Sequence, residues 1–548
     1  MTYSIIVVSL VIIFFGYLLY QKQVENRLFI TEIRNWWVNG RSRDRNFHQI
    51  ATYHSLQSQN TPLNSLDDRT WEDMNMNEVF AEADRGISPI GQQYLYSLFH
   101  APKKSEPELL NFDRLTKLFS ADQSIREKFQ QFFKNLDVSE SYYLPHYFLD
   151  ELEPSQGWHK FVPVLSVISI LTVSLVYFFP PTIFLLILII PLNTIVHYYF
   201  QQKMNISLQS LRSLKLMIYA GKNIAAFKNE TIDEYSQDLP KHLAKLKKLE
   251  RRLKPVIFDK SNYDELSKGI LQLMSVVTLF EVTAFILTLE MIRQTQDDLH
   301  KVFITIGYLE AAISIASLRQ GIPYFSTPYF SEPKKSLTVE ELYHPLIKNP
   351  VANNLKIDGH SLLITGSNMS GKTTFLRTLG VNAIMAQTVY TTFAKSYQAP
   401  FLNVKSVIGR ADNLLEGKSY YLAEVEAVNE LVKLADKDEQ HLFIVDELLR
   451  GTNTTERIAA GKAVLEYLNQ KNHLALAATH DKDLSQLLGN SFEYYYFQEC
   501  IENNELSFDY KIRNGVTTTR NAIALLDIFG YPKVLVKNAL DTATLIES

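Results

Sequence analysis

Residues 366–373 read Gly-Ser-Asn-Met-Ser-Gly-Lys-Thr, and this stretch decides the fold of the second half of the chain. It follows the apolar run HSLLIT (360–365) and opens into TTFLRTLGVNAIMAQ, which is the pattern of a buried strand, a glycine-rich turn and a helix. Glycines let the backbone curl so that its N–H groups face phosphate oxygens, and the helix N-terminus adds partial positive charge. The pattern predicts a nucleotide-binding loop made of Gly366, Ser367, Asn368, Met369, Ser370, Gly371, Lys372, Thr373 and Thr374.

Two side chains of this loop have separate expected tasks. Lys372 is expected to bridge the β- and γ-phosphates of a nucleotide, and Thr373 is expected to ligate Mg²⁺. The metal and the attacking water also need carboxylates, and the apolar run HLFIVD (441–446) ends on Asp446, which Glu447 follows. We expect Asp446 to hold Mg²⁺ through water and Glu447 to act as the general base. The predicted cofactors are therefore ATP and Mg²⁺.

A third apolar run, LALAAT (474–479), is followed by His480. An imidazole at this strand end could contact the γ-phosphate, although a histidine without such a loop nearby is more often structural. Near-continuous apolar runs that alternate with helical segments are typical of parallel strands buried on both faces. FEYYYF (492–497) and LSFDYKI (506–512) predict an added antiparallel hairpin. Residues 335–548 are therefore predicted to form an α/β P-loop ATPase domain with a mostly parallel sheet.

These segments resemble the MutS family of mismatch-repair ATPases, which belong to the ABC class. The strongest similarity lies in four stretches: ITGSNMSGKTTFLRTLG, LFIVDELLRGTNTTERIAAGKAVLEYL, LAATHDKDL and FDYKIRNGVTTTRNAIALLDIFGYP. A weaker similarity relates ADRGISPIGQQYLYSLFHAP to the start of the family's core-and-lever region. The resemblance covers about residues 65–548, most strongly from residue 340 onward. It implies an ABC-like ATPase domain preceded by an all-α core and lever region.

The resemblance assigns further residues to the nucleotide. Ser419, in GKSYYLAEVEAVNEL, matches the signature serine that reaches the γ-phosphate held by the other subunit, and Glu424 matches the acid on the following turn. Gln387 matches the Q-loop position, and Asn353 ends the segment that faces the nucleotide. The resemblance thus implies a homodimer whose ATPase domains sandwich two nucleotides and move the helical levers, which in the family clamp double-stranded, mismatched DNA.

The sequence also departs from the family. The stretch before residue 65 leaves no room for the mismatch-recognition and connector domains. Phe80-Ala81-Glu82 has the pattern of the Phe-x-Glu wedge that stacks on a mispair, but it lies where the core region begins, and we expect it not to act as a wedge. Leu449 and Asn453 replace the usual Gly and Ser after the acid pair, and Pro350 stands where an aromatic residue often stacks on the base.

The composition of the 548-residue chain excludes several classes of protein. With 46% hydrophobic and 21% charged residues, it is not an intrinsically disordered chain. A net charge of −4 gives no global basic field, so any contact with nucleic acid or anionic lipid must be local. A single cysteine, Cys500, excludes an intramolecular disulfide and a cysteine-rich zinc site, which fits a reducing compartment.

Two apolar stretches predict membrane segments. Residues 4–20 carry no charge and basic residues follow them, which favours a retained anchor with the N-terminus outside over a signal peptide. Residues 161–200 lack Asp, Glu, Lys and Arg and are interrupted by Pro180 and Pro181. They predict a transmembrane hairpin, with a buried pair of soluble helices as the alternative. The predicted location is the cytoplasmic (inner) membrane, multi-pass, with the ATPase domain in the cytoplasm.

Residues 270–291 are apolar too, but Glu281 lies near their middle. Because a charge inside the membrane is costly, we expect a buried or partner-facing helix and not a further span. The predicted organisation is an N-terminal anchor at 1–20, a juxtamembrane linker at 21–64, a helical core and lever region at 65–330 that contains the hairpin at 161–200, and the ATPase domain at 335–548.

One predicted helix is strongly basic. Residues 241–254 read KHLAKLKKLERRLK, with a stripe formed by Leu243, Leu246, Leu249 and Leu253. The leucine stripe is expected to pack inside the protein. The basic face could meet nucleic-acid phosphate or the anionic inner leaflet, or it could be an ordinary solvated face.

Three functions follow from these patterns and stay open at this point. The first is a membrane-anchored ATPase that works as a homodimer, each site being completed by Ser419 of the second copy. The second adds double-stranded DNA, mismatched or not, as the substrate of the levers. The third is an ATPase that acts on membrane lipid, or on an unidentified membrane or repair protein, without DNA.

Overall fold

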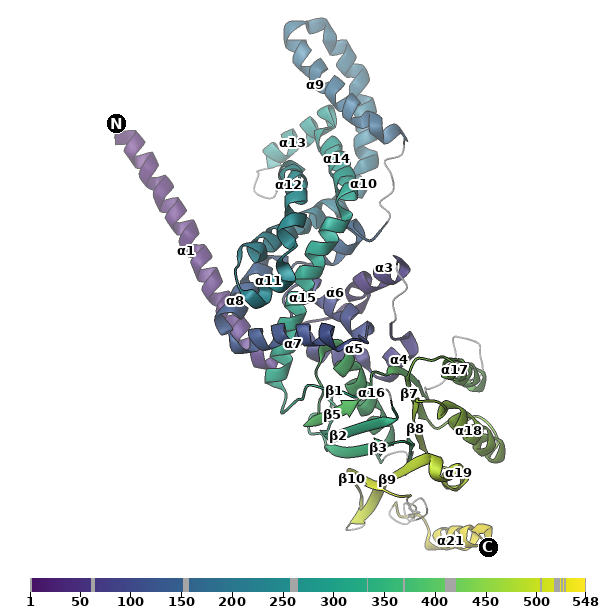
Figure 1. The fold of residues 1–548 in the computed structure, drawn as a ribbon. Coiled ribbons are helices and arrows are strands. Elements are labelled where there is room, and N and C mark those ends of the chain that lie inside the picture. The colour runs from purple at the N-terminus through teal and green to yellow at the C-terminus, as the bar shows by residue number, and fades with distance from the viewer. Residues whose placement is uncertain are drawn as a thin grey trace. The chain divides into compact units, whose positions relative to one another are not determined.

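The computed structural model describes residues 2–60, 65–150, 157–256, 265–332, 334–367, 370–409, 420–502, 505–516, 523, 526 and 529–547. The chain divides into two compact units, each built from segments that are far apart in the sequence (Figure 1). The helical unit comprises Met1–Leu63, Asp84–Ser97 and Arg114–Gly321. The sheet unit comprises Asn64–Ala83, Leu98–Asp113 and Ile322–Ser548.

The helical unit confirms the predicted all-α region. Its helices are α1 (Thr2–Asn39), α2 (Phe47–Ile50), α3 (Thr52–Asn60), α8 (Gln123–Phe133), α9 (Val162–Phe178), α10 (Ile183–Ala226), α11 (Glu230–Ser236), α12 (Leu239–Val256), α13 (Glu265–Thr278), α14 (Phe280–Gln294) and α15 (Gln296–Gly321). Two more helices, α6 (Pro89–His100) and α7 (Glu106–Ala121), have residues in both units.

Helix α1 continues without a break past residue 20, where a linker was expected to begin. Its C-terminal part is fastened to the helical unit. Arg34 forms an ion pair with Glu127 of α8 at 2.6 Å, and the guanidinium of Arg126 lies 3.7 Å from the centroid of the Trp37 ring. Most side chains of residues 2–20 lie outside the description, so the N-terminal anchor stays a prediction.

A buried carboxylate explains why the segment before α6 has its sequence. Glu310 of α15 is fully buried and accepts hydrogen bonds from the backbone N–H groups of Ile87 and Ser88, at 2.5 and 2.6 Å, and from the Ser88 hydroxyl. A Cβ on Gly91 would lie 2.4 Å from the Glu310 carboxyl carbon, so this position needs glycine. Burial raises the pKa of Glu310 to about 7. The carboxylate thus caps the start of α6 and ties it to α15.

Helices α9 and α10 form the predicted apolar hairpin, with Pro180–Thr182 at its turn. Gly157–Phe178 and Pro180–Phe200 are each long and apolar enough to cross a membrane. Their large side chains point outward; the exposed fractions of Phe178 and Leu188, for example, are 75% and 76%. Gln296–Gly321 of α15 is also long and apolar enough, but 78% of its most apolar stretch is buried inside the helical unit. The exposed hairpin therefore provides two candidate membrane spans.

The apolar stretch 270–291 is not the single helix that its composition predicts. Helix α13 ends at Thr278, α14 begins at Phe280, and the two are bent by 69° at Leu279. The predicted leucine stripe of α12 is confirmed, because Leu243, Leu246, Leu249 and Leu253 are all buried. The exposed face of that helix carries Lys241, Lys245, Lys247, Lys248, Arg251 and Arg252.

The sheet unit contains a six-stranded sheet in the order β10-β9-β4-β8-β7-β6. Its strands are β4 (Ser361–Thr365), β6 (Asn403–Ile408), β7 (His441–Asp446), β8 (Leu474–Thr479), β9 (Phe492–Glu502) and β10 (Glu505–Asn514). All neighbouring pairs are parallel except the β9–β10 hairpin. This confirms a mostly parallel sheet with an antiparallel hairpin added to it.

A second, four-stranded sheet was not expected from the sequence. Its strands, in the order β1-β5-β2-β3, are β1 (Tyr329–Phe330), β2 (Ser336–Leu342), β3 (Asn353–Asp358) and β5 (Ser396–Ala399). β3 alternates buried and exposed residues, so it has the pattern of a half-exposed strand and not the continuous apolar run that marks β4, β7 and β8. The helices of the sheet unit are α4 (Asp68–Asp73), α5 (Met76–Ala83), α16 (Lys372–Val389), α17 (Tyr420–Ala435), α18 (Thr454–Leu468), α19 (Lys482–Leu488) and α21 (Lys533–Glu547).

Helices cover both faces of the six-stranded sheet (Figure 1). Phe443 and Val445 of β7 belong to an apolar cluster that includes residues of α17 and α18. Ile444, between them, approaches Gly380 of α16. Because successive side chains of a strand point to opposite faces, α16 lies on one face and α17 and α18 lie on the other. The near-continuous apolar strands are the consequence of this double burial.

Two helical glycines of the sheet unit allow a matched test of this packing. A Cβ on Gly380 would lie 2.4 Å from the Met74 sulfur and 2.8 Å from the Ile444 Cδ1, whereas a Cβ on Gly461 of α18 would have nothing within 4 Å. We expect Gly380→Ala to lower the free energy of unfolding by about 1–3 kcal/mol through overpacking. Gly461→Ala is expected to raise it by about 0.5–1 kcal/mol, because alanine favours helix over glycine. Hydrogen exchange of the β7 amides measures both; equal stability of the two variants would contradict this packing.

Candidate functional site

Three neighbouring strands end at the same edge of the six-stranded sheet. In the parallel register, Thr365 of β4 pairs with Thr479 of β8, and Ala478 of β8 pairs with Asp446 of β7. The glycine-rich loop, the acid pair and His480 therefore all leave the sheet at one place. Ligands of open parallel sheets bind at the carboxyl ends of the strands.

The loop after β4 has the backbone that its glycines predict. Gly366 has φ 139° and Gly371 has φ 103°, and a Cβ on Gly366 would lie 2.7 Å from the carbonyl oxygen of Phe497. Lys372 is buried and its ammonium donates hydrogen bonds to the carbonyls of Gly366 and Ser367, at 2.6 and 2.7 Å. Burial lowers the pKa of Lys372. Asn368 and Met369 lie outside the described residues.

The predicted metal ligands are in contact. The Thr373 hydroxyl donates a hydrogen bond of 2.5 Å to Oδ2 of Asp446. The other carboxylate oxygen, Oδ1, is buried and has no hydrogen-bond partner among the described residues. Burial raises the pKa of Asp446. A hydroxyl beside a carboxylate oxygen that lacks a partner fits Mg²⁺, which takes oxygen ligands and is usually held by one or two protein groups together with phosphate and water.

Glu447 sits in a short network of charged side chains. Its backbone has φ 51°, its N–H donates to the carbonyl of Ala478, and its carboxylate contacts Nδ1 of His480 at 3.4 Å and Nε of Arg450 at 3.0 Å. The hydrogen bond from His480 lowers the pKa of Glu447, against the opposing effect of burial, and the same contact raises the pKa of His480. Glu447 is therefore ionised at neutral pH, which is the state that a general base needs.

The turn after this acid pair is held by Glu424 of α17. Its Oε1 accepts a hydrogen bond of 2.5 Å from the backbone N–H of Leu449, which has φ 57°. A leucine in this left-handed region is strained, whereas the glycine usual in the family would not be. Asn453 caps α18, with its side-chain oxygen accepting from the N–H of Thr455. Ser419, which precedes α17 in the sequence, lies outside the described residues.

The structure does not place Gln387 with the loop. Gln387 lies about 22 Å along α16 from Lys372, at 1.5 Å per residue. It is buried, and its amide exchanges hydrogen bonds with both backbone groups of Leu402, donating to the carbonyl at 2.9 Å and accepting from the N–H at 2.7 Å. The assignment of Gln387 to the nucleotide is therefore wrong. Its role is to fix the chain after α16.

Asn353 also has a structural task. Its Nδ2 donates to the carbonyl of Tyr510 at 3.0 Å and its Oδ1 accepts from the N–H of Ile512 at 2.9 Å. Both groups of the amide are used to hold an irregular part of β10, where Tyr510 has φ 53°. These bonds give Asn353 a positioning role, and its contact with a nucleotide stays a prediction.

Two residues of the β9–β10 hairpin, which the sequence did not single out, reach the loop. The Ser367 hydroxyl donates a hydrogen bond of 2.7 Å to Glu499. The ring of Tyr510 lies 3.2 Å from the position of a Cβ on Gly371. The only sequence signal for them was the expected hairpin itself, whose strand neighbours the loop strand β4.

Phe80 has no exposed surface with which to meet a base. Its ring is fully buried and packs edge to face against Phe99, with 6.2 Å between the centroids. This agrees with the expectation that Phe80-Ala81-Glu82 is not a wedge.

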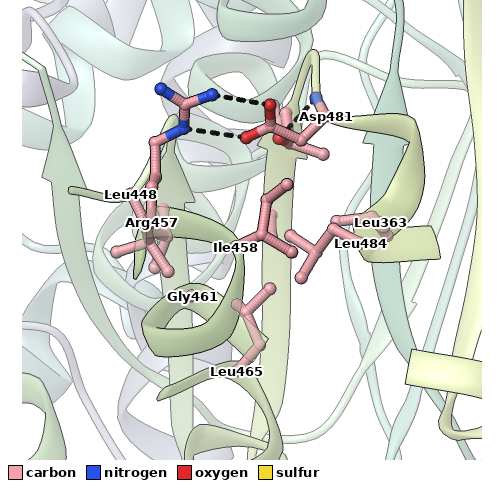
Figure 2. Close-up of a pocket in the computed structure, with 12 residues that line it drawn as sticks. Leu363, Leu448, Arg457, Ile458, Gly461, Leu465, Asp481 and Leu484 are labelled. Carbon is pink, nitrogen blue, oxygen red and sulfur yellow. Dashed lines mark hydrogen bonds and ion pairs between the residues drawn. The ribbon is translucent and has the colours of Figure 1, made fainter. Parts of the chain in front are cut away.

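A small cavity lies close to the site, between α18 and the sheet. Figure 2 shows Arg457 and Asp481 at its mouth, joined by two hydrogen bonds of 2.8 and 3.0 Å. Apart from this ion pair and Thr479, the lining residues are apolar and include Leu363, Ile458, Leu465 and Leu484. An apolar lining does not suit a triphosphate, so the cavity is a gap in packing beneath the strand that carries His480.

Residues 362–547 match the model of MutS domain V. The DNA mismatch repair protein MutS of Staphylococcus haemolyticus (strain JCSC1435) is 30% identical over 271 residues, which are 47% of this chain and 30% of that protein. The MutS proteins of Streptococcus pyogenes serotype M1 and Streptococcus suis (strain 98HAH33) are 28% and 31% identical over 262 and 248 residues, and the matched parts are 30% and 28% of their lengths. This chain thus shares weak homology with MutS proteins over about half its length, while covering less than a third of these relatives.

The contact between His480 and Glu447 predicts a change in pH dependence. In His480→Ala the hydrogen bond that lowers the pKa of Glu447 is lost, so the carboxylate takes up a proton at higher pH than in the native protein. The acid limb of the ATP hydrolysis profile, recorded from about pH 3.5 to pH 7, should move to higher pH. Glu447→Gln should abolish turnover across this range with nucleotide binding retained. An acid limb that His480→Ala leaves in place would show that His480 does not act through Glu447.

Proposed function

We propose that the protein is a Mg²⁺-dependent ATP hydrolase of the MutS type that works as a homodimer at the cytoplasmic membrane. The observation that carries the proposal is the contact between Thr373 and Asp446 at the sheet edge where Glu447 and His480 also lie. The match of residues 362–547 to MutS domain V supports the same chemistry.

Each part of the site has its own task in hydrolysis. The N–H groups of the loop and the ammonium of Lys372 bind the phosphates, and Thr373 and Asp446 hold the metal. When bound, Mg²⁺ neutralises charge on the phosphate oxygens. Glu447 accepts a proton from the attacking water, and His480 and Arg450 keep its carboxylate ionised and oriented.

The second copy completes each site through Ser419. Ser419 immediately precedes α17, and Glu424 of this helix holds the turn after Asp446 and Glu447 in the same chain. In the homodimer, a γ-phosphate contacted by Ser419 of one copy is therefore linked, through one helix, to the hydrolytic site of that copy. Binding of ATP at one site thus changes the turn that carries Glu447 at the other site. Closure of the dimer then moves the helical unit.

Mixing two inactive variants tests whether the site is shared between copies. Ser419→Arg and Lys372→Ala should each abolish turnover as pure proteins. If Ser419 acts on the partner's nucleotide, a 1:1 mixture regains up to about a quarter of native turnover, because half of the dimers are mixed and each has one complete site. If Ser419 acts within its own chain, no mixture regains activity. Nucleotide binding by the Ser419→Arg variant should stay near native, which shows that the variant is folded.

A second candidate function adds double-stranded DNA as the substrate of the helical unit. The exposed face of α12 is the observation that supports it. Lys241, Lys247, Lys248 and Arg251 are exposed along this helix. Helix α12 packs beside α10 near Gly221, since Leu243 is 3.4 Å from where a Cβ on Gly221 would lie. That point is about 30 Å beyond Phe200, where the apolar hairpin ends. The basic face continues from this point toward α14, where Arg252 donates to the carbonyl of Leu287 at 3.4 Å. A row of exposed cations suits the phosphates of a duplex.

A binding experiment separates this candidate from the alternative without DNA. Retention of labelled duplexes, matched and mispaired, should fall steeply with salt and show little base preference. Lys247→Glu together with Lys248→Glu should weaken binding of both duplexes and lower the salt slope by about 2. Lys437→Glu, an exposed lysine in the turn before β7, is the control for charge. If neither duplex is retained at low salt, the remaining function is that of an ATPase acting on a membrane or protein partner. The exposed apolar hairpin supports that alternative.

A further inference from the structure

The break between α13 and α14 is an unusual feature of the helical unit. Leu279 joins the two helices with φ 52° and ψ 23°, a left-handed conformation that bulky residues rarely adopt. A helix that stops leaves the carbonyls of its last turn without partners inside the helix. The chain has no glycine or proline at this point, so the conformation must be stabilised by its surroundings.

The apolar hairpin supplies the missing partners. Nδ2 of Asn193, on α10, donates a hydrogen bond of 2.6 Å to the carbonyl of Val277, and the hydroxyl of Ser166, on α9, donates one of 2.6 Å to the carbonyl of Thr278. Asn193 also donates to the Ser169 hydroxyl at 2.9 Å, and both of these side chains are fully buried. Each helix of the hairpin thus caps one free carbonyl of the break. Figure 1 shows α13 and α14 beside the hairpin.

These contacts lie well inside the apolar part of the hairpin. Asn193 is about 10 Å along α10 from Phe200, at 1.5 Å per residue, and Ser166 is six residues beyond Lys160. The hydrocarbon core of a bilayer is about 30 Å thick. If the hairpin crosses the membrane, the break lies about a third of the way into the core. Broken helices are tolerated at this depth where neighbouring side chains satisfy the freed backbone groups.

The chain reaches this depth and then leaves on the side from which it came. Before α13 it forms α12, whose Arg252 donates to the carbonyl of Leu287 on α14 at 3.4 Å, so the end of α12 lies beside α14. After α14 it returns to α12, because Asp298 at the start of α15 accepts from His242 and Lys245 of α12 at 2.7 and 3.1 Å. Helix α14 therefore runs back along α12, whereas a full span would carry the chain to the opposite side of the membrane.

The side of the break that does not face the hairpin is apolar and exposed. The exposed fractions are 65% for Leu273, 57% for Met274 and 52% for Phe280. Ser275, between them in sequence, is buried and contacts His197 of α10 at 3.4 Å. This exposed face continues the outward-facing apolar surface of α9 and α10, so the same medium is expected to cover both.

We propose that α13, Leu279 and α14 form a re-entrant membrane element, which enters the hydrocarbon core beside the hairpin, breaks there and returns to the cytoplasmic side. This replaces the buried or partner-facing helix expected from Glu281, whose side chain is half-buried. Lipid covers Leu273, Met274 and Phe280, and Asn193 and Ser166 satisfy the break. The element leads through α15 to Gly321, where the sheet unit begins in the sequence. This last step rests on the proposed function: movement driven by ATP reaches α13 and α14 inside the bilayer.

Cysteine labelling tests the location directly. In a Cys500→Ser background, which has no other cysteine, single cysteines replace Met274, Arg293 and Tyr219. Tyr219 is the control, because it is exposed on α10 beyond the hairpin. In inverted vesicles, with the cytoplasmic face outward, a membrane-impermeant maleimide should label Y219C and R293C readily. M274C should react at less than about a tenth of that rate and become reactive in denaturing detergent, because lipid excludes both water and reagent.

The other outcomes overturn the proposal. Rapid labelling of M274C in intact vesicles would place α13 outside the membrane. Labelling of R293C from the extracytoplasmic side, in right-side-out vesicles, would make the pair a full span. Labelling is measured without nucleotide, so an inactive ATPase leaves the result standing. Conversely, a freely labelled M274C would leave the ATPase proposal untouched.

A matched pair of variants tests the capping of the break. Asn193→Leu keeps the size and raises the apolarity of the hairpin helix, so insertion is expected to persist, but it removes the donor to Val277. Thr194→Val is the control, because the Thr194 hydroxyl bonds within its own helix, to the carbonyl of Ile190. Asn193→Leu should raise the labelling rate of M274C several-fold, and Thr194→Val should not. Unchanged protection in Asn193→Leu would rule out Asn193 as the group that holds the element.

Discussion

The hydrogen bond from Thr373 to Asp446 depends on a constraint set by the backbone, because β4, β7 and β8 must end at the same level. A slip of one residue in β7 would turn Asp446 toward the opposite face of the sheet. Packing prevents this slip. Ile444 meets Gly380 of α16 on one face, and Phe443 and Val445 pack with α17 and α18 on the other. The apolar core on both faces therefore fixes the geometry of the polar site at its edge.

The turn after β7 shows how the site is kept in a strained form. Glu447 and Leu449 both have positive φ, although neither is glycine. Such a conformation persists when its surroundings stabilise it, and here the buried carboxylate of Glu424 accepts the N–H of Leu449. Glu424 belongs to the helix that follows Ser419. The strain around Glu447 is thus linked to the segment that we propose contacts the partner's nucleotide.

The sequence predicted those parts of the fold whose physical causes lie within a short stretch. β7 and β8 coincide with their apolar runs, because strands buried on both faces have no polar interruption. The second sheet was missed, since a short strand that alternates buried and exposed residues, such as β3, gives a weak signal. The break at Leu279 has no local signal, because it depends on Asn193 and Ser166, which are far away in the sequence.

For the site too, the sequence predicted the features with local causes and missed those that depend on distant residues. The motifs indicated which residues gather at the sheet edge, because the ends of the strands and the order of the loops can be read directly from the sequence. It did not indicate which polar atoms the fold would use for itself. Gln387 and Asn353 occupy motif positions, yet Leu402 and the backbone of β10 take up their amides. Glu499 and Tyr510 were missed for the opposite reason, since they lie on a hairpin whose strand β9 pairs with β4.

The unbroken course of α1 has a consequence for how two copies meet. A helix of 38 residues is about 57 Å long, nearly twice the thickness of the hydrocarbon core. If residues 4–20 cross the membrane, the C-terminal half of α1 is a rigid helix outside the bilayer. The contacts of Arg34 and Trp37 hold the end of this helix against the helical unit. Each molecule would then drift in two dimensions at a set height above the lipid. Two copies confined to the membrane plane would collide far more often than the same number of copies free in the cytoplasm. The proposed homodimer could then form with only a weak intrinsic affinity between its subunits.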